Sequence, residues 1–96
     1  MNYTFHPHAE KELEQIETDY YGIREELGDR FREEIQRTIS RVLKFPNGCT
    51  PLAATIRYCK LIKFPYGIIY RIRPAEIRIL AVTHHRRRPY YWAYRT

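Results

Sequence analysis

The sequence predicts an α+β fold in which an antiparallel helical hairpin packs on a mainly antiparallel, four-stranded sheet that includes an N-terminal strand. In the first half of the chain, apolar residues recur at spacings of three and four, as on one face of a helix. The second half has short runs rich in β-branched and aromatic residues, separated by turns, as expected for strands. A length of 96 residues with 44% hydrophobic residues suits one core, so we expect a single domain over residues 1–96.

The N-terminal strand and the first helix are expected to meet at Pro7. Residues 2–6 are rich in aromatic and β-branched side chains, and Pro7 suits the first turn of a helix. The apolar stripe that follows, from Ala9 to Ile23, has helical spacing. The opposite face of this helix is charged, and we expect its side chains to lie in solvent. They are Glu10, Lys11, Glu12, Glu14 and Glu17.

A second helix is expected after a break at Gly22 and Gly28. Its apolar stripe runs from Phe31 to Phe45, and Asp29 near its start suits the positive end of the helix dipole. Because the break between the two stripes is short, the helices should form an antiparallel hairpin.

Three strands and a short helix are expected in the second half of the chain. The strands cover residues 55–63, 67–73 and 76–84 and should form an antiparallel meander. The third has four consecutive apolar residues at 79–82, which indicates a central strand covered on both faces. Residues 90–95 are expected to form a short C-terminal helix.

Alternation along the middle strand of the meander predicts which face meets the helices. Ile68, Tyr70 and Ile72 share one side, and we expect them to contact the helices. The other side carries Arg71 and Arg73, so we expect that face of the sheet to be open and positive.

Charge is distributed unevenly along the chain. The net charge is +6, but residues 1–34 contain ten acidic and four basic residues, a balance of −6. Residues 35–96 contain thirteen basic residues and one acid, a balance of +12. This asymmetry indicates that the second part presents a positive surface to an anionic partner, either nucleic acid or an acidic protein segment.

The apolar runs are too short to span a membrane, and the N-terminus is acidic where a signal peptide needs an apolar stretch. We therefore expect a cytoplasmic protein with no membrane partner. Cys49 and Cys59 lack CxxC spacing and are expected to be two reduced thiols. His84 and His85, adjacent at a strand end, should point to opposite faces and not share a metal. We expect neither a metal nor a cofactor.

The segment "HHRRRPYYWAYR", residues 84–95, combines aromatic rings with arginines and contains no acid. We expect Trp92 to anchor this segment on the sheet, while arginines extend the positive face. The expected surface for binding the target or the partner consists of Arg71, Arg73, Arg86, Arg87 and Arg88.

Two stretches, "FPYGIIYRI" at 64–72 and "IRILAVTHHRRRPYYWAYR" at 77–95, resemble the RelE/ParE superfamily of toxins from bacterial type II toxin–antitoxin systems. The second contains a V-x-H-x-x-R-x-P-x-x-W pattern similar to that of the superfamily. The resemblance covers nearly the whole chain. It assigns a structural role to Tyr66, Tyr70, His84, Pro89 and Trp92.

The resemblance implies one of two activities. RelE-like members are ribosome-dependent endoribonucleases that cleave mRNA, whereas ParE-like members bind DNA gyrase and cause DNA breaks without chemistry of their own. Both are neutralised by an antitoxin whose extended segment wraps around the toxin. Because the second part of this chain is so basic, we expect the antitoxin to be acidic.

This chain has only some of the residues that the ribonucleases of the superfamily carry at their five catalytic positions. When the chain is aligned on its Y-x-x-x-Y pair, the two lysine positions fall on Tyr58 and Lys60, and one arginine position falls on Gly67. A later arginine position falls on His85, and the tyrosine position on Tyr91. Because only two of the five match, the resemblance favours the ParE-like branch and gyrase as the target.

The ribonuclease reading remains an alternative, with the ribosome and mRNA as partners. RNA cleavage without a metal needs a base, an acid and cations. Lys60, His85 and Tyr91 would be the acid–base candidates, and Arg71 and Arg87 would hold the phosphate. A third alternative is a non-toxic, basic nucleic-acid-binding module.

Overall fold

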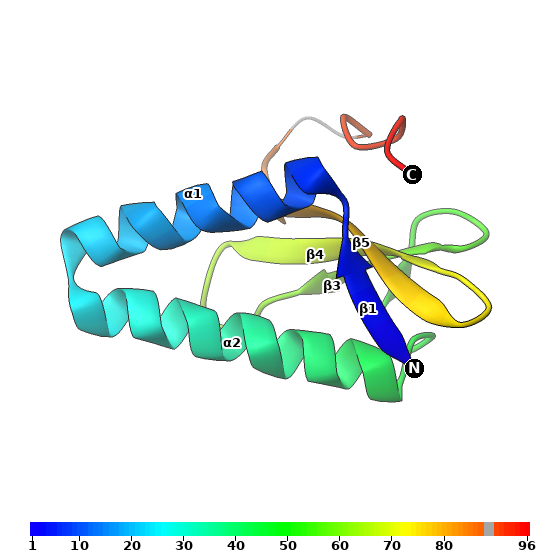
Figure 1. Cartoon of the computed structure of the whole chain (residues 1–96), viewed down its shortest axis with the longest axis horizontal. Coiled ribbons are helices and arrows are strands. Elements are labelled where there is room, and N and C mark those ends of the chain that lie inside the picture. Colours follow the sequence, from blue (N-terminus) through cyan, green and yellow to red (C-terminus); the bar gives the residue numbers. More distant parts are fainter. Residues whose placement is uncertain (88–89) are drawn as a thin grey trace.

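The computed structural model describes residues 1–87 and 90–96 of the chain. Two helices form a hairpin against a sheet (Figure 1). The elements in chain order are β1 (Asn2–Phe5), α1 (Pro7–Ile23), α2 (Glu25–Lys44), β2 (Thr50–Pro51), β3 (Ile56–Lys60), β4 (Tyr66–Ile72) and β5 (Glu76–His84). The predicted α+β fold is confirmed.

The sheet has five strands in the described residues, one more than predicted, in the order β1-β5-β4-β3-β2. β1 runs parallel to β5, and all other neighbours are antiparallel. The additional strand, β2, consists only of Thr50 and Pro51 at the far edge beside β3. Two residues are too few to produce a detectable alternation, so the sequence does not reveal this strand.

The two helices join more tightly than predicted. Only Arg24, with extended backbone, separates them, and α2 already begins at Glu25. Gly28 is therefore inside the helix and does not break it. The Tyr21 ring packs on Gly28 so closely that an added Cβ would lie 2.3 Å from Tyr21 Cδ1. Glycine at 28 permits this close approach of the two helices.

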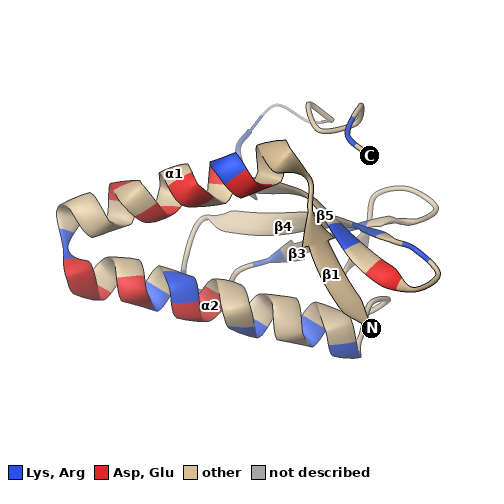
Figure 2. Cartoon of the chain, in the orientation of Figure 1, with Lys and Arg blue, Asp and Glu red and all other residues tan. Residues whose placement is uncertain are grey.

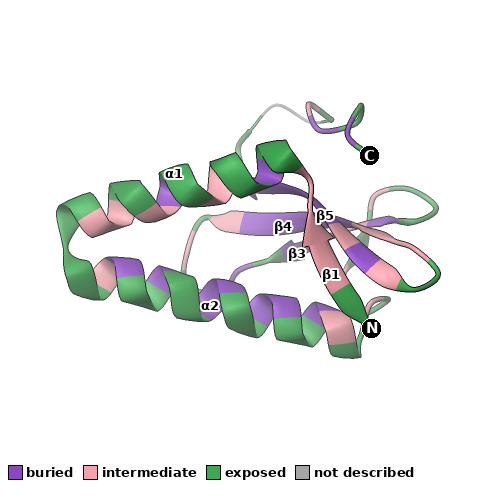
Figure 3. Cartoon of the chain, in the orientation of Figure 1, coloured by how far each residue is buried: buried purple, intermediate pink, exposed green. Residues whose placement is uncertain are grey.

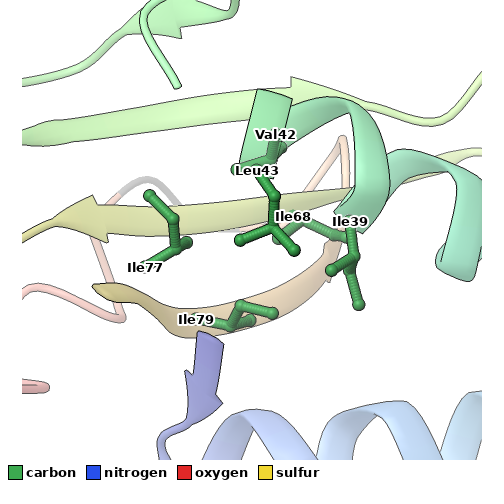
Figure 4. A pocket seen from close by; sticks show the side chains of 6 residues that line it. All are labelled: Ile39, Val42, Leu43, Ile68, Ile77 and Ile79. Carbon is green, nitrogen blue, oxygen red and sulfur yellow. The ribbon is translucent and has the colours of Figure 1, made fainter. Parts of the chain in front are cut away.

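The helix-facing side of the sheet carries the main core. Phe31, Ile35 and Ile39 on α2 are buried with Ile68 and Tyr70 on β4. Figure 3 shows buried positions along both helices and on β4. Six aliphatic side chains between α2 and the sheet surround a gap with no room for a water molecule, so this part of the core is dry (Figure 4). They are Ile39, Val42, Leu43, Ile68, Ile77 and Ile79.

A second, smaller core covers the opposite face of the sheet, which was expected to be open. Its members are Ile56, Ile69, Leu80, Ala81 and Trp92. A β-bulge lies in β5, since Ile69 pairs with Ala81 and Tyr70 with Ile79, which leaves Leu80 as an extra residue. Leu80 and Ala81 therefore both face the second core, while Ile79 and Val82 face the helices, so all four residues are apolar. β5 lies between β1 and β4, so the prediction of a central strand covered on both faces is confirmed.

The C-terminal segment forms turns, not the predicted helix. Ala93 N–H donates to Tyr90 O at 3.0 Å and Arg95 N–H to Trp92 O at 2.9 Å, and both bonds span three residues. Residues 88 and 89 lie outside the described part, as do the expectations for Arg88 and Pro89. Among the described helices, none is long and apolar enough to cross a membrane.

Candidate functional site

A hollow of about 200 Å³ lies where the C-terminal segment folds back over the sheet, on the face opposite the helices. The residues that line it come from three strands and from the chain after β5. They are Tyr58, Ile69, Thr83, His84, His85, Arg87, Tyr91 and Trp92. Trp92 is buried and forms the apolar floor together with Ile69. The hollow therefore combines an apolar floor with a polar rim.

Three of the five ribonuclease candidates meet in this hollow, namely His85, Arg87 and Tyr91. Lys60 is exposed opposite Gly67 on the neighbouring strand and is not among the lining residues. Arg71 lies further along β4 and donates to Thr55 Oγ1 at 3.4 Å. The structure thus separates the two predicted strand cations from the hollow.

Tyr58 occupies the space that a side chain at position 67 would need. A Cβ built on Gly67 would lie 2.3 Å from Tyr58 Cε1, so the ring covers the glycine. The Tyr58 hydroxyl is buried and has no hydrogen-bond partner among the described residues. Burial raises the pKa of this phenol. At positions 58 and 67, two of those where the resemblance expects cations, this chain therefore has an aromatic ring and the glycine that the ring covers.

Tyr91 is engaged with Glu12 of α1. Its hydroxyl donates to Glu12 Oε2 at 2.9 Å, and Arg87 lies over the Tyr91 ring, 4.0 Å from the ring centroid. Burial raises the pKa of the Tyr91 phenol, and the hydrogen bond to Glu12 acts in the same direction. The phenol is therefore held in its protonated form and committed to a carboxylate.

Glu12 does not lie in solvent as expected. Its side chain is only 15% exposed, and it accepts hydrogen bonds from both Nη atoms of Arg95 and from the N–H of Val82. Arg87 lies 4.0 Å away. Glu12 and Arg95 were both missed as site residues, because the helical pattern places Glu12 on the charged face and Arg95 is one of several arginines in the basic C-terminal segment. The only signal in the sequence was that residues 84–95 contain arginines but no acid, so that an ion pair for one of them had to come from another part of the chain.

The free edge of β5 explains why these two side chains converge. β1 pairs with β5 only as far as Ile79, so the backbone groups of β5 beyond Ile79 have no strand partner on that side among the described residues. Glu12 accepts from Val82 N–H, and Arg95 Nη1 donates to Leu80 O at 2.9 Å. Side chains from α1 and from the C-terminal segment thus supply the hydrogen bonds that the buried backbone groups at this sheet edge require.

His84 and His85 do not point to opposite faces. Their rings stack with centroids 4.6 Å apart, because the chain turns directly after β5. His84 also packs edge-on against Tyr66, and His85 Nδ1 lies 3.0 Å from Pro65 O. Within residues 1–87 and 90–96, no group of three or more potential metal ligands occurs.

Four of the five arginines expected to form one surface, all but Arg88, lie in the described residues, and these four are divided between two places. Arg71 lies near the C-terminal end of β4, and Arg73 follows that strand. Arg86 and Arg87 follow the C-terminal end of β5, which runs antiparallel to β4, so they lie at the opposite end of the sheet. Arg73 is paired with Glu76 at 3.2 Å and also donates to Thr96 O. The second core lies between the two groups. Figure 2 shows the acids along α1 and the first half of α2, and the basic residues mainly elsewhere.

Tyr66 and Tyr70, the aromatic pair of the resemblance, face the helix-side core. Tyr70 is completely buried, and its hydroxyl donates to Pro46 O at 2.6 Å. Tyr66 is half-buried and packs edge-on against Phe31 and Tyr20. Both tyrosines therefore stabilise the contact between the sheet and the helices.

Comparison with known proteins agrees with this architecture. A solved structure titled "Chromosomal ParDE TA system from P. aeruginosa" is similar with a TM-score of 0.73 and 19% sequence identity, over 88% of this chain and 95% of that one. A search of curated proteins finds no match. The sequence model of one family, described as "ParE toxin of type II toxin-antitoxin system, parDE", matches residues 3–89. The chain therefore belongs to the ParE toxin family of type II toxin–antitoxin systems.

Proposed function

We propose that this chain arrests growth by binding DNA gyrase in the cytoplasm, and that an acidic antitoxin neutralises it. The observation that supports this target is the packing of Tyr58 over Gly67. A ribonuclease of this superfamily would need cations at these two positions to stabilise the phosphorane. Neither position can supply one here, and an arginine at 67 would displace the Tyr58 ring.

The state of Tyr91 supports the same conclusion. A catalytic tyrosine must be free to exchange a proton with the substrate, and the ideal pKa for that exchange is near the working pH. The Tyr91 hydroxyl instead donates to Glu12, and burial raises its pKa. The ring serves to hold Arg87 and the C-terminal segment against α1.

Induction of the chain without its antitoxin tests the proposal. We expect double-strand DNA breaks and filamentous cells, with translated messages left intact. His85→Ala is the discriminating variant, because this exposed ring should be dispensable for a protein that performs no proton transfer. Growth arrest that is unchanged in a strain whose gyrase resists such toxins would contradict gyrase as the target.

A second candidate function is ribosome-dependent cleavage of mRNA. The hollow favours it, because His85, Arg87 and Tyr91 line one space of about 200 Å³. Histidine is the side chain most often used for proton transfer near neutral pH. Under this alternative, primer extension after induction should show new 5′ ends on translated messages. His85→Ala should then abolish the cleavage and the toxicity together.

The antitoxin is expected to bind by charge as well as by shape. The balance of +12 over residues 35–96 can attract an acidic chain and speed its association. Arg86 is exposed, and its backbone N–H donates to His84 Nδ1. Its exposed guanidinium can therefore contact such a partner. Co-purification of the chain with the product of a neighbouring acidic reading frame is the direct test.

A further inference from the structure

Cys49 and Cys59 face each other across the β2–β3 edge of the sheet. β2 and β3 pair antiparallel, with Thr50 opposite Tyr58 and Pro51 opposite Arg57. Carrying this register one residue further places Cys49 opposite Cys59. Both cysteines are free thiols in the structure.

The hydrogen-bond pattern places this pair at a close position. Leu52 N–H donates to Ile56 O at 2.8 Å, and bonded and non-bonded pairs alternate along an antiparallel ladder. Pro51, which has no N–H, is therefore at a non-bonded position opposite Arg57. Continued past the end of β2, the same alternation puts Cys49 and Cys59 at a non-bonded position, where paired Cα atoms are typically about 4.5 Å apart. That separation is within the range of about 4.4–6.8 Å that disulfides need.

The two side chains also lie on the same face of the sheet. Cys59 belongs to the helix-side core, with 3% exposure, and Cys49 packs against that core while remaining partly exposed. Arg57 Nη1 donates to Cys49 O at 2.7 Å and to Asn47 O at 3.0 Å, which holds the segment before β2 against β3. The pair is therefore positioned by backbone pairing and by a side-chain clamp.

A cation lies next to the buried thiol. Arg41, in the last turn of α2, has its Nη2 atom 3.4 Å from Cys59 Sγ and 3.5 Å from Lys60 O. Burial raises the pKa of the Cys59 thiol to about 11, and the hydrogen bond from Arg41 opposes that rise. Arg41 can stabilise the Cys59 thiolate while it reacts.

We propose that Cys49 and Cys59 are a cross-strand redox pair, which a hydroperoxide oxidises to an intramolecular disulfide. Cys49, the accessible member, attacks the peroxide as a thiolate, forming an S–O bond and breaking the O–O bond. The proton lost by the Cys49 thiol goes to the leaving oxygen, so the products are a sulfenic acid and water, or a sulfenic acid and an alcohol when the peroxide is organic. The Cys59 sulfur then attacks the sulfur of the sulfenic acid, the S–O bond breaks, and hydroxide leaves with the Cys59 proton as water. Two thiols and one peroxide thus yield one disulfide.

The disulfide would fasten β2 and the turn that follows α2 to β3. Tyr70 already holds this turn through Pro46 O. The cross-link closes a short loop in the unfolded chain and should raise the Tm by roughly 10 °C. Because the bacterial cytoplasm keeps thiols reduced, this disulfide would form under oxidative conditions and would not be a permanent structural cross-link.

The test treats the purified full chain with one equivalent of hydrogen peroxide, then denatures it in an alkylating reagent. We expect intact mass to show the loss of two hydrogens, no alkylation, and a monomer on non-reducing gels. Dithiothreitol should restore two alkylated thiols and the original Tm. Cys49→Ser should leave Cys59 alkylated after peroxide treatment. Because a buried serine at 59 can unfold the chain, Cys59→Ala is the matched variant for the second thiol, and it should accumulate the sulfenic acid.

Arg41→Gln provides an independent measurement, with Arg37→Gln one turn earlier as its control. Arg37 is exposed, and its guanidinium pairs with Glu33. We expect disulfide formation to slow several-fold in Arg41→Gln and to be unchanged in Arg37→Gln. The proposal is overturned if the treated wild-type chain retains two alkylated thiols. Disulfide-linked dimers through Cys49, with Cys59 still free, would also overturn it.

Discussion

Arg95 Nη1 lies 2.9 Å from Glu12 Oε1, although the two residues are separated by 83 positions in the chain. The Arg95 side chain is 6% exposed and that of Glu12 is 15% exposed, so the ion pair is largely removed from water. The cost of desolvating two charges can exceed their Coulomb attraction, so the pair by itself is weak evidence of stabilisation. Its structural importance is that both partners also bind the backbone of β5, at Val82 N–H and Leu80 O. The ion pair thus closes the sheet edge and holds the last turn of the chain on α1.

Glu12→Gln should destabilise the fold by about 2–4 kcal/mol, because it leaves the buried Arg95 without its counter-charge. Urea unfolding followed by circular dichroism measures the change. Glu14→Gln is the matched control, since Glu14 is exposed on the same helix, and it should change stability by less than about 0.5 kcal/mol. Adding Arg95→Met to Glu12→Gln should recover part of the loss. Equal midpoints for Glu12→Gln and Glu14→Gln would show that Glu12 does not hold the segment.

Gly67→Ala should cost roughly 1–3 kcal/mol, because the new methyl group would collide with the Tyr58 ring in a packed site. If the ring is the cause, Gly67→Ala should cost far less in a Tyr58→Ala background. A double-mutant cycle with urea midpoints measures this coupling. Additive single effects would mean that another neighbour of Gly67 sets the cost. Gly22→Ala is the control, since a Cβ at that helical position meets nothing within 4 Å.

His6 should make the start of α1 sensitive to acid. Its Nδ1 accepts a hydrogen bond from His8 N–H at 3.1 Å, which requires an unprotonated Nδ1. Burial and the neighbouring His8 lower the pKa of His6 in the folded protein below 6.5. Because protonation is easier in the unfolded chain, the stability from this cap is complete above pH 6.5 and falls as the pH drops below it.

His6→Asn tests this pH dependence, because asparagine also caps helices well but does not titrate in this range. Unfolding midpoints should be compared for the variant and the wild type at pH 7.5 and pH 5.5. We expect the wild type to lose more stability on acidification than the variant. Parallel losses in the two proteins would show that the other titrating groups determine the pH response.

The elements that the sequence predicts well are those with a local periodic signal. The stripe from Phe31 to Phe45 and the apolar run at 79–82 both depend on near neighbours in the chain, and both predicted the correct element. Gly28 was misinterpreted because a glycine in a sequence cannot show whether it breaks a helix or receives a ring from another helix. β2 is held by its pairing with β3, and pairing leaves no pattern in a strand of two residues.

The site was only partly predictable for the same reason. His85, Arg87 and Tyr91 could be selected because the resemblance fixes their positions, and they do line one hollow. The role of Glu12 depends on a contact across the whole chain, and its helical spacing alone places it on the polar face. The Tyr58 ring over Gly67 is a packing relationship, which residue types alone cannot show.

Association with the antitoxin should depend on Arg86. This residue follows β5 at the basic end of the sheet, and its side chain is exposed. Charge reversal at the rim of an interface mainly changes the association rate and its salt dependence. Arg87 is less suitable for this test, because its guanidinium lies over Tyr91 and close to Glu12, so reversing it would also disturb the C-terminal segment.

Arg86→Glu should therefore slow association with an acidic antitoxin several-fold at low salt, with little change in the dissociation rate. The difference should shrink at high salt, because screening acts over about 8 Å at physiological ionic strength and over less in concentrated salt. Both rate constants can be measured by surface plasmon resonance at two salt concentrations. Arg24→Glu is the matched control, since it makes the same charge change between α1 and α2, in the acidic half of the chain. An equal slowing by Arg24→Glu would mean that only net charge matters. An unchanged, salt-insensitive association rate in Arg86→Glu would mean that the antitoxin does not approach this end of the sheet, and that its basic side chains serve the target.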